Sequence, residues 1–235
     1  MNDTKKPNKI LTFSYDDGVL QDKRLIELFD RYGMKATFNL NSELLGKPHS
    51  LTIDGKQIAH DKIEPGDVRS VYAGHEVAAH TLTHPRLPTL PDEEVIRQVE
   101  QDRKKLSELC GYEVVGFAYP CGGENYDGRV SSLIREKTGI RYCRTIISSH
   151  SFDPQENLYE FKPSVYHNGE WDKLFSLGEE FLSLSTEERK VFYVWGHSYE
   201  FDIHDTWGRF EEFLKMMSGK DDILYATNRE ALLVP

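Results

Sequence analysis

The chain has 235 residues, of which 38% are hydrophobic and 29% are charged, and its formal net charge is −10. This length and composition suit one sizeable core, and we expect a single domain over residues 1–235. The negative charge and the lack of a Lys/Arg-rich run argue against nucleic acid and anionic membranes as partners.

The amino-terminal residues show no recognisable targeting segment. Residues 1–9 are polar, and the apolar run 10–13 is too short for a signal core or a membrane span. Cys110, Cys121 and Cys143 have no CxxC spacing, which favours reduced thiols. We therefore expect a cytoplasmic protein, unless a signal was removed before this numbering starts. The oligomeric state stays open.

Short apolar runs that predict buried strands recur along the chain. They cover residues 10–13, 36–40, 76–79, 114–119, 140–147, 191–195 and 223–226. Amphipathic patterns that predict helices lie between most of them, over residues 25–32, 95–109, 130–134, 171–184, 207–217 and 228–233. This alternation predicts an α/β fold with parallel strands, either a barrel or a doubly wound sheet.

Two local features accompany this pattern. Residues 46–69 are rich in Gly, Pro, Asp and Lys, and they predict an irregular surface insertion beside the substrate entrance. Residues 89–92 resemble a capping box and predict the start of the second helix, while Asn228 is expected to cap the last one.

Reactive side chains follow the predicted strands, at or just beyond their carboxyl ends. They are Asp16, Asp17, His80, the loop Tyr119-Pro120-Cys121-Gly122, Arg144 and His197. In a (β/α) barrel these ends share one face, where active sites are assembled. The pattern therefore favours a barrel with one site.

The adjacent aspartates and the pair His80 and His84 predict a metal site. Two imidazoles and one carboxylate can hold a divalent ion and leave a position for water, while the other aspartate carries protons. Alone, Asp16-Asp17-Gly18 is typical of a turn, and the histidine pair is equally compatible with ordinary loop residues. Their common position after strands favours metal binding.

The other seven histidines are not expected to bind the metal. His197 follows a large apolar run and suits a general acid, with a core histidine as the alternative. Six others have no partner at ligand spacing and are expected to be surface or structural residues: His49, His60, His75, His150, His167 and His204.

The motifs together resemble the polysaccharide deacetylase family, the NodB-homology domain of carbohydrate esterase family four. The resemblance rests on Ser14-Tyr15-Asp16-Asp17-Gly18, His80-Thr81-Leu82-Thr83-His84, Ala118-Tyr119-Pro120-Cys121-Gly122 and Val194-Trp195-Gly196-His197. It implies a distorted (β/α) barrel, here with about seven parallel strands, and a divalent metal. That metal is most often Zn²⁺, with Co²⁺, Ni²⁺ or Mn²⁺ as alternatives.

The same resemblance implies a role for each site residue. Asp17, His80 and His84 would bind the metal, Asp16 would be the base and His197 the acid. The loop from Tyr119 to Gly122 would contact the substrate, with the Cys121 N–H supporting the oxyanion.

This sequence departs from the family pattern at two places. The arginine that orients the base is replaced by Ala118. Our candidate substitute is Arg144, whose guanidinium is expected to reach across neighbouring strands and hold Asp16 at two points, although a surface arginine is an equal alternative. The family also has a variable segment that contains a tryptophan. We cannot locate it in this sequence, because spacing identifies neither Trp171 nor Trp207 as that residue.

The leading hypothesis for function is removal of an N-acetyl group from an amino sugar or an acetylated oligosaccharide. O-deacetylation of a carbohydrate ester and hydrolysis of another small amide remain alternatives, as does a non-catalytic carbohydrate-binding protein. A glycosidase is disfavoured, because its two carboxylates must flank the scissile bond about 5 to 9.5 Å apart.

Overall fold

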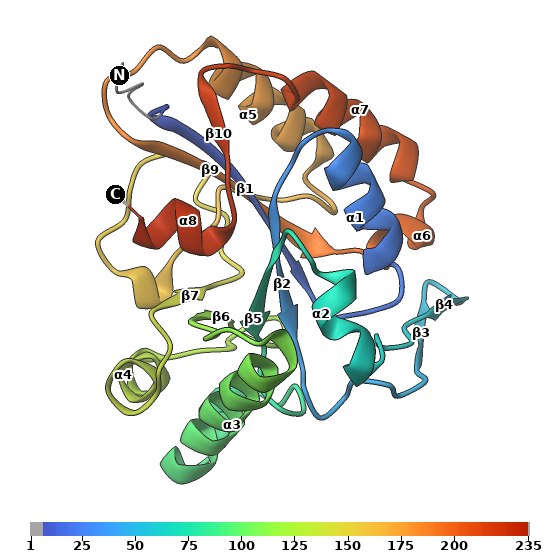
Figure 1. Ribbon diagram of the computed structural model, residues 1–235, viewed down its shortest axis with the longest axis vertical. Coiled ribbons are helices and arrows are strands. Elements are labelled where there is room, and N and C mark those ends of the chain that lie inside the picture. The colour runs from blue at the N-terminus through green and yellow to red at the C-terminus, as the bar shows by residue number, and fades with distance from the viewer. Residues whose placement is uncertain (1–6, 235) are drawn as a thin grey trace.

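A curled parallel sheet forms the centre of the computed structural model, which describes residues 7–234 (Figure 1). Every strand pairing in this sheet is parallel. Along the sheet, the strands are β7 (Tyr142–Arg144), β6 (Gly116–Ala118), β5 (Glu76–Ala79), β2 (Ala36–Leu40), β1 (Lys9–Asp16), β9 (Lys190–His197) and β8 (Val165–Tyr166). An eighth strand, β10 (Ile223–Tyr225), pairs with the start of β1.

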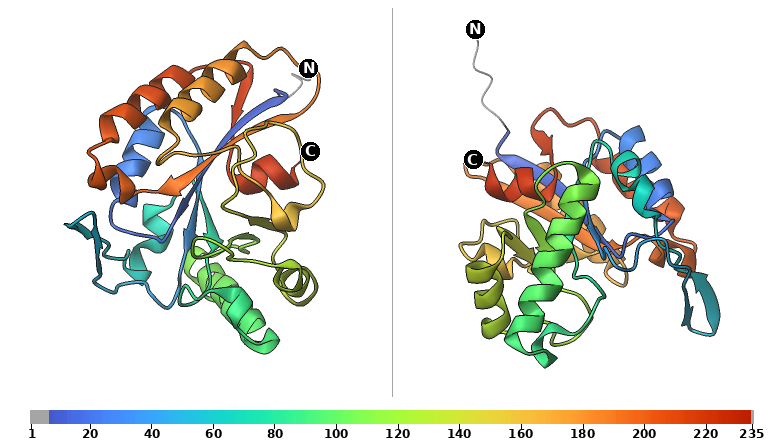
Figure 2. Two further views of the ribbon diagram at one scale, coloured as in Figure 1. Left: turned by 180° about the vertical axis from the view of Figure 1, so that it is seen from behind. Right: turned by 60° about the horizontal axis from the view of Figure 1, so that its bottom comes forward.

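Helices surround the outer side of the sheet in two groups (Figure 2). One group packs α1 and α5 against α7, and the other packs α3 against α4. The helices are α1 (Asp22–Arg31), α2 (Val68–Val71), α3 (Asp92–Cys110), α4 (Gly128–Lys137), α5 (Trp171–Ser183), α6 (Glu200–Ile203), α7 (Trp207–Met217) and α8 (Asn228–Leu233). Short 3₁₀ turns are η1 (Pro65–Asp67), η2 (Leu87–Thr89) and η3 (Leu158–Glu160).

The segment 161–166 connects the two edges of the curled sheet. Phe161 donates its N–H to the Cys143 carbonyl of β7 at 3.0 Å, and Ser164 donates to the Tyr193 carbonyl of β9 at 2.8 Å. The predicted distorted barrel with about seven parallel strands is confirmed. The sequence missed β8, however, and the predicted seventh strand is β10, which lies off the main path.

The helix starts differ from the predicted caps. Thr89 ends η2, and α3 begins after Pro91 without a side-chain cap, so the capping box predicted at 89–92 does not form. A true capping box precedes α8, where Thr227 and Glu230 exchange side-chain to backbone bonds. Asn228 is the first residue of that helix, one position after the cap.

The expected irregular stretch 46–69 contains a hairpin. Strands β3 (Ser50–Ile53) and β4 (Lys56–Ala59) pair antiparallel and project from the body (Figure 2). The residues after β4 turn inward: Leu20 donates to the Asp61 carbonyl and Ile63 donates to the Gly18 carbonyl, both at 2.9 Å. Ile63 is fully buried, so this part of the segment belongs to the body rather than to the surface.

Among residues 7–234, no helix has the length and apolar character that a membrane crossing requires.

Candidate active site

A cavity of about 440 Å³ opens at the carboxyl ends of the sheet strands. It is lined by most of the predicted site residues: Asp16, Asp17, His80, His84, Tyr119, Cys121, Gly122 and His197. Pro120 and Arg144 do not line it. The barrel thus brings together residues that are up to 181 positions apart, from Asp16 to His197.

Three side chains in this cavity form a donor set for a metal ion. Donor atoms of Asp17, His80 and His84 all lie within 4.8 Å of one another, and His84 Nε2 is 3.7 Å from Asp17 Oδ1. Asp17 and His80 are buried, whereas His84 is partly open to the cavity. A carboxylate and two imidazoles at this spacing fit a divalent ion with a position left open for water.

The bonding of His80 leaves one ring nitrogen free for a metal. Its Nδ1 lies 2.8 Å from the Ala118 carbonyl, which accepts a hydrogen bond and therefore fixes the proton on Nδ1. Burial lowers the pKa of His80 to about 4, so the imidazole is neutral near pH 7. Nε2 then presents a lone pair to the site.

Asp16 is buried between one cation and two imidazoles. Arg144 Nη2 donates to both carboxylate oxygens, at 2.5 Å to Oδ1, and Asn39 donates to Oδ1 at 2.8 Å. Nε2 of His80 and Nε2 of His197 each lie 3.9 Å from Oδ2. Burial alone would raise the pKa of Asp16, but the Arg144 charge and the two histidines outweigh it and lower that pKa. The carboxyl therefore stays ionised and able to accept a proton.

Arg144 contacts Asp16 as predicted from the sequence, but the geometry of the contact differs from the prediction. One nitrogen contacts both oxygens, instead of two nitrogens contacting one each, and the guanidinium packs 4.4 Å from the centre of the Trp195 ring. Arg144 is completely buried, so the alternative of a surface arginine is wrong.

His197 pairs with an acidic residue that the sequence analysis did not identify. Its Nδ1 is 3.2 Å from Glu200 Oε1, and its backbone N–H donates to Glu200 Oε2 at 3.0 Å. Burial alone would lower the pKa of His197, but Glu200 and the two aspartates raise it to about 9. The imidazole is therefore protonated at neutral pH, as a general acid requires. In the sequence, only the three-residue separation of His197 and Glu200 indicates this pair.

The loop after β6 borders the same cavity. Cys121 Sγ is 3.8 Å from His84 Nδ1, and Asn125 donates to the Cys121 carbonyl at 2.9 Å. Within residues 7–234 the Cys121 amide has no hydrogen-bond acceptor, so it is available to a ligand. The Tyr119 side chain is buried, and its hydroxyl donates to the Tyr159 carbonyl at 2.8 Å, so that proton is already engaged.

Four site residues hold a left-handed backbone. The φ angles are 84° at Asp17, 71° at Thr81, 60° at His84 and 70° at Cys121. Such conformations cost on the order of 1–3 kcal/mol for residues other than glycine, and they concentrate at functional sites.

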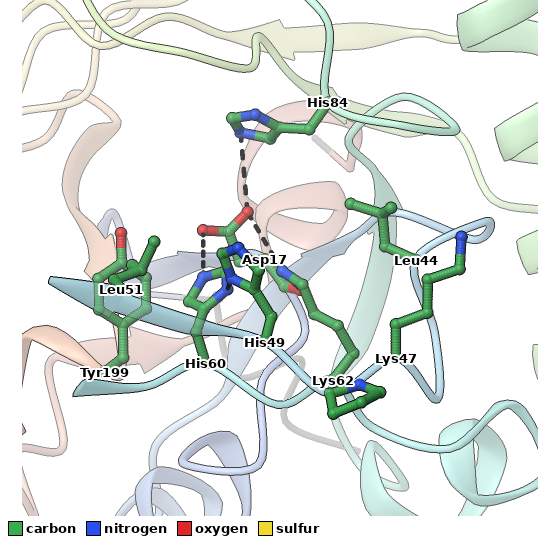
Figure 3. A pocket seen from close by; sticks show the side chains of 10 residues that line it. Asp17, Leu44, Lys47, His49, Leu51, His60, Lys62, His84 and Tyr199 are labelled. Carbon is green, nitrogen blue, oxygen red and sulfur yellow. Dashed lines mark hydrogen bonds and ion pairs between the residues drawn. The ribbon is translucent and has the colours of Figure 1, made fainter. Parts of the chain in front are cut away.

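Asp17 also faces a second cavity, of about 410 Å³, between the metal site and the hairpin (Figure 3). On this side His60 Nε2 lies 3.2 Å from Asp17 Oδ2, and Lys62 Nζ donates to the Asp17 carbonyl at 2.7 Å. His60 and Lys62 are both buried. Sequence reasoning missed them as neighbours of the site, because they lie in a segment expected to be irregular.

The other histidines lie outside the donor set, as predicted. His75 accepts a hydrogen bond from the Ala36 N–H at 3.1 Å, and His167 stacks on Phe201 with ring centres 4.4 Å apart. His60 is outside the donor set too, but it contacts the proposed ligand Asp17.

Comparisons with known proteins agree with this geometry. A family model described as polysaccharide deacetylase matches residues 3–143. None of the proteins with curated annotation matches the chain in sequence.

Solved structures with the same fold are distant in sequence. A candidate polysaccharide deacetylase from Mycobacterium smegmatis has a TM-score of 0.67 at 16% identity, covering 97% of this chain and 90% of that one. A family 4 carbohydrate esterase from Streptomyces lividans, in complex with acetate, has a TM-score of 0.59 at 16% identity, with 94% and 93% covered.

A polysaccharide deacetylase from Bacillus cereus has a TM-score of 0.50 at 16% identity, covering 63% of this chain and 44% of that chain. The chain thus spans less than half the length of the Bacillus cereus protein and about nine-tenths of the other two. At these identities the likeness shows the fold.

Proposed function

Because this chain belongs to the polysaccharide deacetylase family, we propose that it is a metal-dependent hydrolase that removes an N-acetyl group from an amino sugar or an acetylated oligosaccharide. The observation that carries the proposal is the arrangement around Asp16 and Asp17. Asp17 forms the metal donor set with His80 and His84, while Asp16 Oδ2 lies 3.9 Å from His197 Nε2.

Each residue of this arrangement has a place in amide hydrolysis. A divalent ion at Asp17, His80 and His84 would acidify a water and polarise the amide carbonyl. Asp16, kept ionised by Arg144, accepts a proton from the attacking water. The Cys121 N–H would support the oxyanion, and protonated His197 would deliver a proton to the departing nitrogen.

The cavity also suits a sugar ring. Tyr166 is half-buried, lines the cavity near His197 and stacks on the buried Trp195 with ring centres 4.4 Å apart. The exposed part of the Tyr166 side chain would offer apolar area to a sugar ring. The Streptomyces lividans relative was solved with acetate, the product of the reaction proposed here.

Metal analysis and an acetate-release assay test the proposal together. The purified protein is analysed for bound metal, and acetate is measured from N-acetylated amino-sugar monomers, oligomers and nucleotide sugars. We expect about one divalent ion per chain and acetate release that stops on chelation and returns with added Zn²⁺. Sugar binding without any acetate release would contradict the proposal and favour a non-catalytic binding protein.

A further inference from the structure

Residues on two opposite sides contact Asp17, the proposed metal ligand. His84 approaches its carboxylate from one direction, while His60 and Lys62 approach it from the other (Figure 3). His60 and Lys62 both follow β4, and we refer to residues 60–63 as the inner arm of the insertion. The inner arm therefore touches the proposed metal site although its sequence gave no such indication.

The inner arm bonds the backbone of residues 17–19, where Asp17 lies. Val19 and Lys62 form an antiparallel bridge, and the Ile63 N–H donates to the Gly18 carbonyl at 2.9 Å. Lys62 Nζ bonds the Asp17 carbonyl at 2.7 Å, next to the left-handed φ of 84°. A residue in that conformation persists only where its surroundings enforce it.

His60 fixes the carboxylate itself. Its Nε2 donates to Asp17 Oδ2 at 3.2 Å, while His84 lies nearer to Oδ1 at 3.7 Å. The other ring nitrogen of His60 faces His49 Nδ1 at 3.0 Å, so the ring is held at both ends. This leaves Oδ1 directed toward the donor set.

We propose that His60 and Lys62 are positioning residues that hold Asp17 ready for a divalent ion, so that the insertion is part of the metal site. Mutation of a residue that hydrogen-bonds a metal ligand typically lowers metal affinity by about 10- to 100-fold. The inference rests on the proposed function, because it needs the ion at Asp17, His80 and His84.

If Lys62 acted only through its charge, it would weaken metal binding instead of supporting it. Its ammonium lies 3.7 Å from Asp17 Oδ1 and would repel a bound cation. If repulsion dominated, removing the ammonium would strengthen metal binding. If positioning dominates, as we propose, removing it weakens metal binding despite the relief of repulsion.

Zinc affinity measured in competition with a chromophoric chelator distinguishes these cases. The metal-free wild type is compared with His60→Leu, His60→Gln and Lys62→Met. Thermal unfolding of each metal-free protein shows that it is folded at the assay temperature. We expect Zn²⁺ affinity to fall about 10- to 100-fold in His60→Leu and Lys62→Met. His60→Gln should recover part of the loss, because its amide can still donate to Asp17.

Gln57→Ala is the matched control. Gln57 lies in the same hairpin, and within residues 7–234 its side chain bonds only the Ser50 hydroxyl, at 3.1 Å, so the variant should bind Zn²⁺ like the wild type. Unchanged affinity in both His60→Leu and Lys62→Met, or tighter binding in Lys62→Met, would overturn the positioning role. A wild type that binds no divalent ion would instead refute the metal site itself, and the inner arm with it.

Discussion

Arg144 and Asp16 meet across the interior of the barrel, although three strands separate β7 from β1 in the sheet. We expected the guanidinium to reach between neighbouring strands, and that expectation is wrong. The contact depends instead on the curl of the sheet, which turns the end of β7 toward the end of β1. Through this closure Arg144 reaches Asp16 in a chain that has an alanine at position 118.

Replacing Arg144 tests whether it supports the base. Arg144→Ala leaves a buried carboxylate without its cation, so we expect kcat to fall on the order of 10²-fold with a smaller change in KM. Loss of a buried ion-pair partner also destabilises a protein by about 3–5 kcal/mol. Steady-state kinetics and thermal unfolding measure both effects. An unchanged kcat would remove Arg144 from the mechanism.

Substitutions at the two adjacent aspartates should separate their roles. Asp16→Asn should retain the metal and lose about 10²- to 10⁴-fold in turnover, because only the base is removed. Asp17→Asn should lose the metal, since it removes the carboxylate ligand. Metal content and acetate release are measured on both proteins. Full activity in Asp16→Asn would show that the base is assigned to the wrong residue.

The pair of His197 and Glu200 predicts a shift in pH dependence. Glu200 raises the pKa of His197 to about 9, and the proposed acid is active only when protonated. Activity should therefore fall as pH rises through about 9. In Glu200→Gln the alkaline limb of kcat/KM should move toward lower pH, and a limb that stays in place would argue against His197 as the acid.

The same pair has a predictable effect on stability. His197 has a pKa raised from 6.5 to about 9, so its contribution is full below 6.5 and is lost as pH rises through 9. Burial alone would raise the pKa of Glu200, but His197 and other partners lower it from 4.5 to about 2. Its contribution is therefore full above 4.5 and is lost as pH falls to 2. The pair should stabilise the fold most between pH 4.5 and 6.5. The free energy of unfolding of wild type and Glu200→Gln, measured from about pH 2 to about pH 9, checks this window.

Gly196 predicts a local packing limit beside the proposed acid. A methyl group at this position would lie 1.9 Å from His167 Nδ1, on a ring stacked against Phe201. Gly196→Ala should therefore destabilise the protein by about 1–3 kcal/mol. Gly208→Ala is the control, because apart from its chain neighbours and the nearby α7 backbone no atom of residues 7–234 lies within 4 Å of the added methyl group, and it should be neutral or stabilising. Equal stability of the two variants would contradict this account.

The sequence predicted the part of the site that lies in short motifs. Asp16, Asp17, His80 and His84 follow buried strands, and parallel strands place their carboxyl ends on one face. Local pattern and one topological rule were therefore enough to bring these side chains together. The partner of Asp16 was also found, because Arg144 ends a strand of the same barrel.

The parts that sequence reasoning missed depend on tertiary contacts. Strand β8 has two residues, too few for any periodic pattern, and it forms because β9 offers an open edge. His60 and Lys62 lie in a Gly- and Pro-rich stretch, and only the pairing of the inner arm with residues 18–20 turns them inward. Pro91, not Thr89, occupies the N-cap position of α3, and no side-chain cap forms there.

The left-handed backbone at Thr81 has a consequence for substitutions at this position. A β-branched residue is rarely found at a φ of 71°, yet the Thr81 hydroxyl accepts the His84 N–H at 3.0 Å and so shapes the turn between two proposed ligands. Relaxing that turn with glycine would ease the backbone and remove this bond. Glycine at position 81 would therefore gain in backbone energy what it loses in the order of the proposed ligands.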